Sequence, residues 1–520
     1  MRKQIRDSSI NRGRACSLSH ETWRRVGAKL ACAGACALMV GQLLLPSVAL
    51  AAEWVNVGGT QYNKGAGDEA GTWSWDGADD MKLNGYDGAG ISAQGNLNIG
   101  VTGTNTVTAD SLRSAIEVKD GNLAITGEGT LNATAEPQKS RSAVKVDCGS
   151  LAISGDVTLN ATAGTDTIAV SGDGKTGGDV DIRGANVNVT ATNKVPHTIG
   201  IHTRAGNITI NEGADVHVEA EANGGFGAVA VYAENISSEH GGCIAVDNAK
   251  LDAAARNANM LSVALYSFGG KDTYLSITNG ADVTLVASDS VEVLDGVWMR
   301  AQDGVSRVLV ENSSLTVRCG DGTGHSRKHG YGIYSQSGSQ SAIPRIDIIN
   351  SNVEVSGNAA AIYAVNQGDA APCLSIDGGS VVTTPAGGTV RKTAGNGLVI
   401  GTAGSSTIQD VRTSDEVARS VVISSGDAVE PGPTPQPGPA PTPTPQPGGG
   451  SGTAAPSATP TQASSTAAAS KPAAQATAAQ KSVGTLAATG DNAATAAAAL
   501  GIAGASVIGA GFVASKRRNR

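Results

Sequence analysis

Aromatic residues are scarce in this 520-residue chain, because Phe, Trp and Tyr together make up only 3% of it. Broad globular cores usually draw on aromatic rings for buried area. Cysteine is also sparse: after residue 51 only Cys148, Cys243, Cys319 and Cys373 remain, 54 to 95 residues apart. No pair has metal-ligand spacing, so we predict no metal site and no cofactor. The chain therefore favours a narrow interior filled by aliphatic residues.

Basic residues are few in the body of the chain. The full sequence has 38 Lys and Arg against 46 Asp and Glu, a net charge of −8. Eight basic and two acidic residues precede Ala52, and four basic residues lie in the last five positions, which leaves 26 basic and 44 acidic residues between them. This balance disfavours nucleic acid or an anionic membrane as the main partner.

The first 51 residues have the composition of a secretory signal peptide. Basic residues are followed by an apolar run over 30–50, and the run closes on the small residues Ala49 and Ala51. Small residues at these two positions are typical of a cleavage site. We expect export of the chain after residue 51, and an uncleaved membrane anchor is the alternative.

The chain becomes repetitive from Ile91 onward. Each unit has an alternating aliphatic pair, a turn residue and a second alternating pair, as in "LAITGEGTLNA" from Leu123, "LAISGDVTLNA" from Leu151 and "LSITNGADVTL" from Leu275. Aliphatic residues at a spacing of two predict strands with one buried face. Gly or Asn at each break predicts a tight corner, because these residues adopt positive φ at low cost.

A third short strand precedes each unit, as in "AVAV" and "SVAL", and the full period averages about 30 residues. Three short strands per turn predict an all-β, right-handed parallel β-helix of about eleven coils over residues 90–428. The Trp-rich, non-repetitive segment 52–89 is predicted to be its N-terminal cap. An array of β-sandwiches is the weaker alternative, because domains of about 100 residues would not show this period.

The repeat also places two cysteines. Cys243 and Cys373 fall in the same column, four coils apart, which is beyond the reach of a disulfide. We expect thiols that are not bridged and that are mostly buried.

The C-terminal region changes character three times. Residues 429–485 are rich first in Pro and then in Ala, Ser and Thr, which predicts a disordered, extended stalk. "LAATG" follows at 486–490, and residues 493–515 carry no charge and are long enough as a helix to cross a bilayer. The basic tail 516–520 is predicted to stay in the cytoplasm.

This order resembles the cell-wall sorting signal of Gram-positive surface proteins, in the LAxTG form associated with actinobacteria. The resemblance rests on Leu486, Ala487, Thr489 and Gly490, with Ala487 where proline is more usual. It implies that a sortase thiolate attacks the carbonyl of Thr489, breaks the Thr489–Gly490 bond and passes the chain to the amine of a peptidoglycan precursor. The protein would then be displayed on the cell wall, with a membrane association only before sorting. A plain C-terminal membrane anchor is the alternative.

The rare aromatic residues of the body concentrate in one column of the third strands. Its members are Tyr232, Tyr266, Trp298, Tyr334 and Tyr363, preceded by His202. Each follows an aliphatic residue, so if that residue points inward, the ring points outward. An exposed row of rings is a stacking platform for a linear polysaccharide, to which Arg300 and Gln336 would add hydrogen bonds. The alternative is that the rings stabilise the sheet through cross-strand packing.

An enzyme is the second functional class, because polysaccharide lyases and hydrolases use β-helices. A hydrolase needs a pair of carboxylates within about 5–10 Å, and the candidates are sparse: Asp295 and Asp303 near Arg300, and a charged corner at 320–330. The body resembles the carbohydrate-binding β-helical surface proteins of Gram-positive bacteria. The sequence therefore predicts a non-enzymatic surface adhesin or carbohydrate-binding protein, whose partners are sortase, a peptidoglycan precursor and an extracellular glycan or host surface. A surface polysaccharide lyase or hydrolase and a passive surface rod remain the alternatives.

Overall fold

The computed structural model describes residues 51–426, apart from 110–113, 138–140, 173–177, 194–196, 236–240, 321–329 and 340. Every regular element in these ranges is a β-strand. No helix in the described part of the chain is long and apolar enough to span a membrane. The predicted signal peptide, apart from Ala51, and the stalk, sorting motif, membrane helix and basic tail lie outside the described residues.

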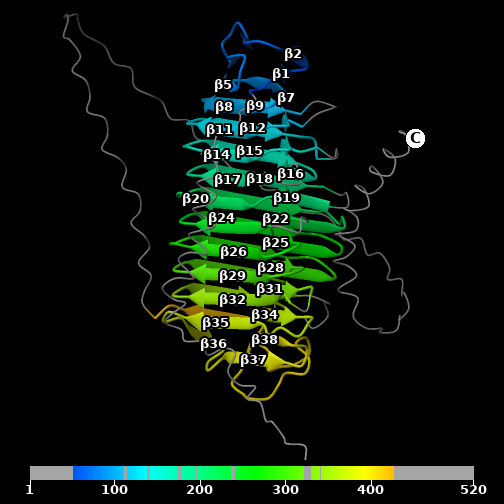
Figure 1. Ribbon diagram of the computed structural model, residues 1–520, viewed down its shortest axis with the longest axis vertical. Coiled ribbons are helices and arrows are strands. Elements are labelled where there is room, and N and C mark those ends of the chain that lie inside the picture. The colour runs from blue at the N-terminus through cyan, green and yellow to red at the C-terminus, as the bar shows by residue number, and fades with distance from the viewer. Residues whose placement is uncertain are drawn as a thin grey trace, which may run out of the picture. The chain divides into compact units, whose positions relative to one another are not determined.

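The strands form three long sheets that run side by side along the molecule (Figure 1). Sheet 1 contains, in chain order, β1 (Trp54–Val57), β2 (Thr60–Tyr62), β7 (Ile91–Gln94), β10 (Ile116–Lys119), β13 (Val144–Asp147), β16 (Asp166–Ser171), β19 (His197–Arg204), β22 (Gly227–Asn235), β25 (Leu261–Gly269), β28 (Val293–Ala301), β31 (Tyr331–Ser337), β34 (Ala360–Asn366), β37 (Thr389–Thr393) and β38 (Gly397–Gly401).

Sheet 2 contains β3 (Ala66–Gly67), β4 (Trp73–Trp75), β5 (Asp80–Asn84), β8 (Leu97–Thr102), β11 (Leu123–Gly127), β14 (Leu151–Ser154), β17 (Val180–Arg183), β20 (Ile208–Asn211), β23 (Cys243–Asp247), β26 (Thr273–Thr278), β29 (Val305–Glu311), β32 (Ile343–Ile349) and β35 (Cys373–Asp377). Sheet 3 contains β6 (Asp87–Ala89), β9 (Thr104–Thr108), β12 (Thr130–Thr134), β15 (Thr158–Ala163), β18 (Asn186–Thr192), β21 (Asp215–Glu221), β24 (Lys250–Arg256), β27 (Asp282–Ala287), β30 (Ser314–Cys319), β33 (Asn352–Ser356), β36 (Val381–Thr384) and β39 (Ser420–Ser424).

The chain visits the three sheets in turn and then begins the next coil, so each strand pairs in parallel with its counterpart one coil away. Equivalent residues stack in register, as Leu123 on Leu151 and Leu131 on Leu159. The fold is therefore a parallel β-solenoid, and the predicted all-β fold class is confirmed. The parallel part comprises ten strands in sheet 1, eleven in sheet 2 and ten in sheet 3 within the described ranges.

Alternation of inward and outward residues builds the core, as the repeat predicts. Leu123 and Ile125 of β11, for example, are buried in a continuous aliphatic cluster that extends along the solenoid. The corners between sheets 2 and 3 hold Asn248, Asn279, Asn312 and Asn350 at positive φ. The prediction of tight Asn and Gly corners is confirmed, because these residues tolerate the left-handed conformation.

A second corner, between sheets 1 and 2, is held by side chains that bind the next coil. The backbone N–H of Asn122 donates to Asn96 Oδ1 at 2.8 Å, and that of Ser150 donates to Asn122 Oδ1 at 2.9 Å. Further along, the backbone N–H of Cys243 donates to Asn207 Oδ1 at 3.1 Å. These bonds satisfy corner amides that the strand ladders leave unpaired.

Antiparallel strands cover two of the three sheets at each end of the stack. At the N-terminal end β1 pairs antiparallel with β2 and β7, and β4 pairs antiparallel with β3 and β5. Since β5 and β6 already pair in parallel with β8 and β9, the stack begins at Asp80 and not at the predicted boundary of 90. At the other end β38 covers β34, and β39 covers β33. Covered edges cannot recruit strands from other chains.

The cysteine predictions are confirmed in part. Cys243 and Cys373 lie in one column of sheet 2, with Tyr274, Arg307 and Arg345 between them. No disulfide joins any of the four described cysteines. The prediction that most are buried is wrong: Cys148 is exposed, Cys243 and Cys373 are half-buried, and only Cys319 is buried.

Candidate functional site

The aromatic column lies on sheet 1 in the predicted register. His202 of β19 is paired with Tyr232 of β22, and the column continues through Tyr266, Trp298, Tyr334 and Tyr363 on the following strands. The aliphatic residue before each ring belongs to the main core cluster: Val231, Leu265, Val297, Ile333 and Ile362. Because successive side chains of a strand point to opposite faces, the rings lie on the outer face of sheet 1.

The rings are nevertheless buried, and the predicted exposed platform is wrong. The exposed fractions are 8% for Tyr232, 3% for Tyr266, 2% for Trp298 and 5% for Tyr334. Tyr363 at the end of the column is half-buried. Burial raises the pKa of the Tyr232 and Tyr334 hydroxyls well above the ordinary value, and nearby charges add to the shift.

Each ring covers the face of its neighbour. Ring centroids are 4.7 Å apart for His202 and Tyr232, 4.8 Å for Tyr232 and Tyr266, and 4.9 Å for Tyr266 and Trp298. The spacing rises to 6.2 Å between Trp298 and Tyr334 and is 5.7 Å between Tyr334 and Tyr363. The faces that a sugar would stack on are therefore already occupied, and the column packs as the alternative interpretation predicts.

The residues two positions beyond the rings also serve packing. The guanidinium carbon of Arg300 lies 5.4 Å from the centre of the Phe268 ring, which is a cation–π distance. Gln336, the next residue in the same column, is buried. These two side chains therefore lie against the protein where the sequence predicts glycan contacts.

A charged cluster that the sequence did not reveal lies at the start of the column. His202 Nδ1 is 3.3 Å from Asp166 Oδ2, and its Nε2 is 3.6 Å from Glu234 Oε2. Arg204 approaches Asp166 at 3.9 Å. Asp166, His202 and Glu234 come from three successive strands of sheet 1, so only the coil register brings them together. The result is a buried imidazole between two carboxylates on the outer face of sheet 1.

The cluster shifts the pKa of each member toward the charged form. Burial alone would lower the pKa of His202, but the charge of Asp166 and the contacts with both carboxylates outweigh burial and raise it. Burial would raise the pKa of Asp166 and of Glu234, but the imidazolium and Arg204 lower both. The cluster therefore favours a protonated imidazole held between two carboxylates.

The carboxylates proposed for catalysis from the sequence do not form an open pair. Asp295 is fully buried, and its Oδ1 accepts the backbone N–H of Tyr331 at 2.9 Å. Asp303 is exposed in a turn, where it accepts hydrogen bonds from Ser341 at 2.7 Å and from the N–H of Gly304 at 2.9 Å. The charged corner at 321–329 lies outside the described residues.

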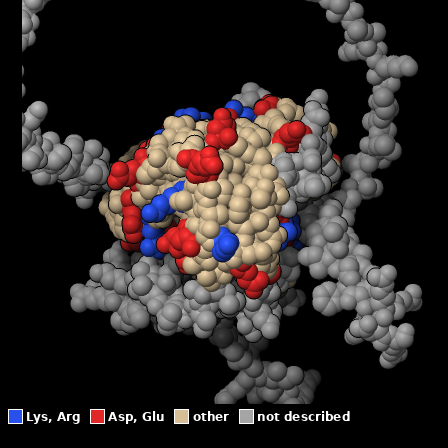
Figure 2. Space-filling model, turned by 90° about the horizontal axis from the view of Figure 1, so that it is seen from above, with Lys and Arg blue, Asp and Glu red and all other residues tan. Residues whose placement is uncertain are grey.

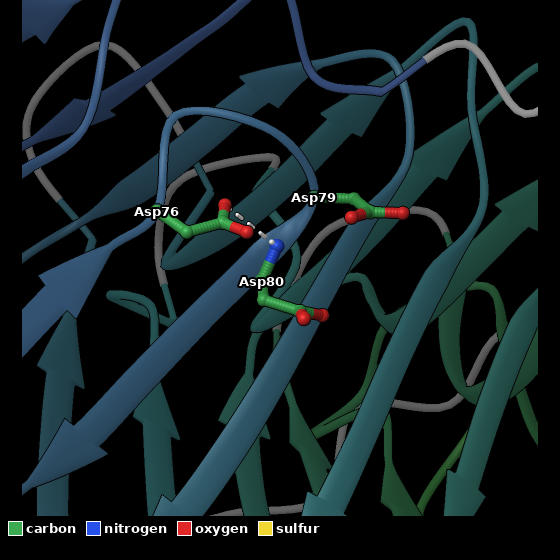
Figure 3. A group of neighbouring side chains, drawn as sticks. All are labelled: Asp76, Asp79 and Asp80. Carbon is green, nitrogen blue, oxygen red and sulfur yellow. Dashed lines mark hydrogen bonds between the residues drawn. The ribbon is translucent and has the colours of Figure 1, made fainter.

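Three carboxylates meet near the N-terminal end, between β4 and β5, in an arrangement absent from the sequence predictions (Figure 3). Oxygen atoms of Asp76, Asp79 and Asp80 lie within 4.8 Å of one another. Asp76 Oδ1 already accepts the backbone N–H of Ala78 at 2.8 Å and of Asp80 at 3.2 Å. These bonds close a tight turn, which accounts for the acidic residues here, and we assign no metal to them.

A hollow of about 490 Å³ lies at the corner between sheets 3 and 1. Its lining consists of Asn223, Gly224, Asn257, Ala258, Asn259, Asp289 and Val291. Three of these residues, Asn223, Asn257 and Asp289, adopt positive φ on successive coils. The amide of Asn257 donates to Glu221 Oε1 at 2.5 Å, so the lining is partly fixed by its own contacts.

The surface charge agrees with the acidic composition of the body. Figure 2 looks onto one end of the molecule, where acidic side chains appear at several places and basic side chains lie beside some of them. Much of the described surface in this view is uncharged.

Comparison with known proteins adds no relative: no family model, no curated protein and no solved structure matches the chain.

Proposed function

We propose that this protein is a surface adhesin that a sortase attaches to the cell wall of a Gram-positive, actinobacterial cell. The observation that carries the proposal is the order of segments after the solenoid: a Pro-rich stretch, "LAATG", an uncharged run of 23 residues and a basic tip. Each segment has a separate physical role in export, retention and transfer. Together with the N-terminal signal they form a complete route to the cell surface.

The solenoid supports this proposal in two ways. Antiparallel strands cover two of the three sheets at each end of the stack, so the long sides of the rod offer the larger surfaces for binding. The last strand, β39, ends at Ser424, and four residues separate it from the predicted Pro-rich segment that begins at 429. The rod is thus joined directly to its predicted stalk.

Adhesion and not catalysis is the proposed activity, because the carboxylates named from the sequence hold the backbone or a turn. The buried aromatic column does not carry the proposal. Within it, Tyr232, Tyr266, Trp298 and Tyr334 are covered by neighbouring rings. A binding surface must therefore lie elsewhere on the rod.

Substitution of Thr489 tests the proposed anchoring. When the full chain is expressed in an actinobacterial host with its own sortase, the product ending at Thr489 is expected in the peptidoglycan fraction after detergent extraction and in the soluble fraction after muralytic digestion. Thr489→Ala removes the residue that would form the acyl-enzyme, so the protein should shift to the membrane fraction and the medium.

Thr485→Ala is the matched control, because this threonine lies just outside the motif. It should leave wall attachment unchanged. Wall attachment of the Thr489→Ala variant at the control level, or equal loss in both variants, would refute sortase transfer at this bond.

A further inference from the structure

The outward residues of sheet 3 change from uncharged to charged along the rod. On β9, β12, β15 and β18 its outward positions form a grid of three columns and four rows, aligned by the strand register. The grid contains eight threonines and four asparagines: Thr104, Thr106, Thr108, Thr130, Asn132, Thr134, Thr158, Asn160, Thr162, Asn186, Asn188 and Thr190. The intervening residues are inward and mostly aliphatic, such as Leu131 and Leu159. We call this surface the Thr/Asn grid.

The columns of the Thr/Asn grid become charged beyond it. On the next strand, β21, the same three columns hold Asp215, His217 and Glu219. On β24 the first two of them hold Lys250 and Asp252, which form an ion pair at 2.8 Å. Twelve adjacent uncharged polar residues in a chain this acidic are therefore a local property of four coils and not a general feature of the sheet.

The central column of the Thr/Asn grid is fixed by its own hydrogen bonds. Asn160 Nδ2 donates to Asn132 Oδ1 at 2.8 Å, and Asn188 Nδ2 donates to Asn160 Oδ1 at 2.9 Å. An amide ladder of this kind holds each side chain in one orientation. A ligand therefore meets donors and acceptors that are already ordered, which lowers the entropic cost of binding.

We propose that the Thr/Asn grid binds a linear, uncharged polysaccharide that lies along the rod. Hydroxyls and carboxamides both donate and accept hydrogen bonds, as the hydroxyls of a neutral sugar do. The rows repeat every 4.7–4.9 Å or so, the usual strand separation, so a polymer with a short repeat meets the same groups in each coil. Threonine methyl groups add small apolar patches between them.

Other classes of partner fit the Thr/Asn grid less well. Protein interfaces depend on Trp, Tyr and Arg at their centres, and the grid has none of these. Anionic polymers need basic side chains, and Lys and Arg are absent from all twelve positions. The proposal rests on the proposed function in one respect, because it takes the ligand to be an extracellular polymer.

Retention of the purified full chain on immobilised polysaccharides tests the proposal without any role for sorting. The probes are xylan, a linear β-1,3-glucan and mannan, with polygalacturonate as the charged comparator. At least one neutral probe should retain the protein more strongly than polygalacturonate does. Thr134→Arg with Thr162→Arg places two long charged side chains in the two middle rows of the grid, in the column beside the amide ladder, and should weaken that binding by about tenfold or more.

Two further variants keep the result interpretable. Thr108→Arg with Thr190→Arg changes only exposed grid positions, so it should fold even if the Thr134/Thr162 variant does not, and it should also weaken binding. Thr284→Arg with Thr316→Arg is the control on the same outer face of sheet 3 beyond the grid, at positions as half-buried as Thr134 and Thr162, and it should bind normally. Thermal unfolding of each variant checks the fold.

Three results would overturn the proposal: no neutral probe retains the protein, polygalacturonate binds better, or the grid and control variants lose equal affinity. None of them bears on wall attachment, which the Thr489→Ala fractionation measures separately. Conversely, failure of sorting would leave the binding measurement valid.

Discussion

The N-terminal and C-terminal coils of the solenoid use one repeat to build different surfaces. In sheet 1 the strands β7, β10 and β13 have four residues each, whereas β22, β25 and β28 have nine. The short strands leave some outward positions accessible, but β25 is buried at every position. The outward side chains of sheet 1 in these later coils therefore form a buried, packed layer, and the aromatic column is part of it.

Along sheet 3 the outward side chains change in charge. Its N-terminal rows are the uncharged Thr/Asn grid, and its later rows carry ion pairs such as Lys250 with Asp252. The inward positions of both regions are mostly Val, Leu, Ile and Ala, with Asn105 as an exception on β9. The inward positions therefore maintain the solenoid, while the outward positions are free to form an uncharged polar surface in one region and a packed layer in the other.

The largest effect should come from the packed layer. Trp298→Ala removes a buried ring between two stacked neighbours and should cost about 3–5 kcal/mol of local stability, as large-to-small core changes do. Hydrogen exchange should accelerate in peptides from β25, β28 and β31. Peptides from β10 and β13 should be unaffected, because solenoid coils stabilise mainly their neighbours.

Val291→Ala is the control for this prediction, because Val291 is 68% exposed. Its effect should stay within about 0.5 kcal/mol. If Trp298→Ala also changed the free energy of local opening, measured by hydrogen exchange, by no more than about 0.5 kcal/mol, the aromatic column would not stabilise the C-terminal coils.

A smaller effect should appear where the two regions meet, at His202. His202→Phe keeps a ring against Tyr232 but removes the cation between Asp166 and Glu234, which should cost roughly 3 kcal/mol near pH 6. The raised pKa of His202 means that its contribution is complete below the ordinary value of about 6.5 and is lost as pH rises through the raised pKa. The lowered pKa values of the two carboxylates mean that their contribution is lost as pH falls through those values.

Thermal midpoints between pH 5 and 9 measure this dependence. The wild-type midpoint should fall more steeply on the alkaline side than that of His202→Phe. His217→Phe is the control, since His217 lies on the surface of sheet 3 with its side chain about half exposed. Parallel pH curves for wild type and His202→Phe would show that the cluster does not hold a cation.

The smallest effect is expected in the N-terminal region. Asn160→Ala removes two amide hydrogen bonds of the ladder, and it should cost about 1–2 kcal/mol, detected by hydrogen exchange in β12, β15 and β18. Thr162→Ala, two residues along the same strand, should change the free energy of local opening measured by hydrogen exchange by less than about 0.5 kcal/mol. Equal effects of the two substitutions would mean that the ladder adds no order to the Thr/Asn grid.

Much of the fold could be predicted because period-two alternation determines which residues face the core. It places Val231 inward and Tyr232 outward, and the repeat aligns Tyr232 with Tyr266 and Trp298 across coils. The exposure of the rings could not be predicted in the same way, since alternation says nothing about what packs on the outer face. A signal was present in the runs "GAVAVYA" and "LSVALYSFG", which do not alternate in polarity and so indicate strands buried on both faces.

The charged cluster around His202 and the Thr/Asn grid could not be predicted from the sequence for a different reason. Asp166, His202 and Glu234 are about 30 residues apart in sequence and meet only when three coils are in register. The Thr/Asn grid is spread over four repeats in the same way. Each row alone, such as "TLNAT", looks like an ordinary half-exposed strand, and only the stacked rows reveal a continuous surface.

The position of β39 determines how a tethered rod would carry tension. Force transmitted through the stalk enters at the C-terminal side of β39, which lies between β33 and β36 in sheet 3 and pairs antiparallel with both. Val421 and Ile423 anchor the strand in the core. Two hydrogen-bond ladders and two buried side chains would have to yield before any coil of the solenoid is loaded, so β39 would act as a mechanical clamp in a rod tethered as proposed.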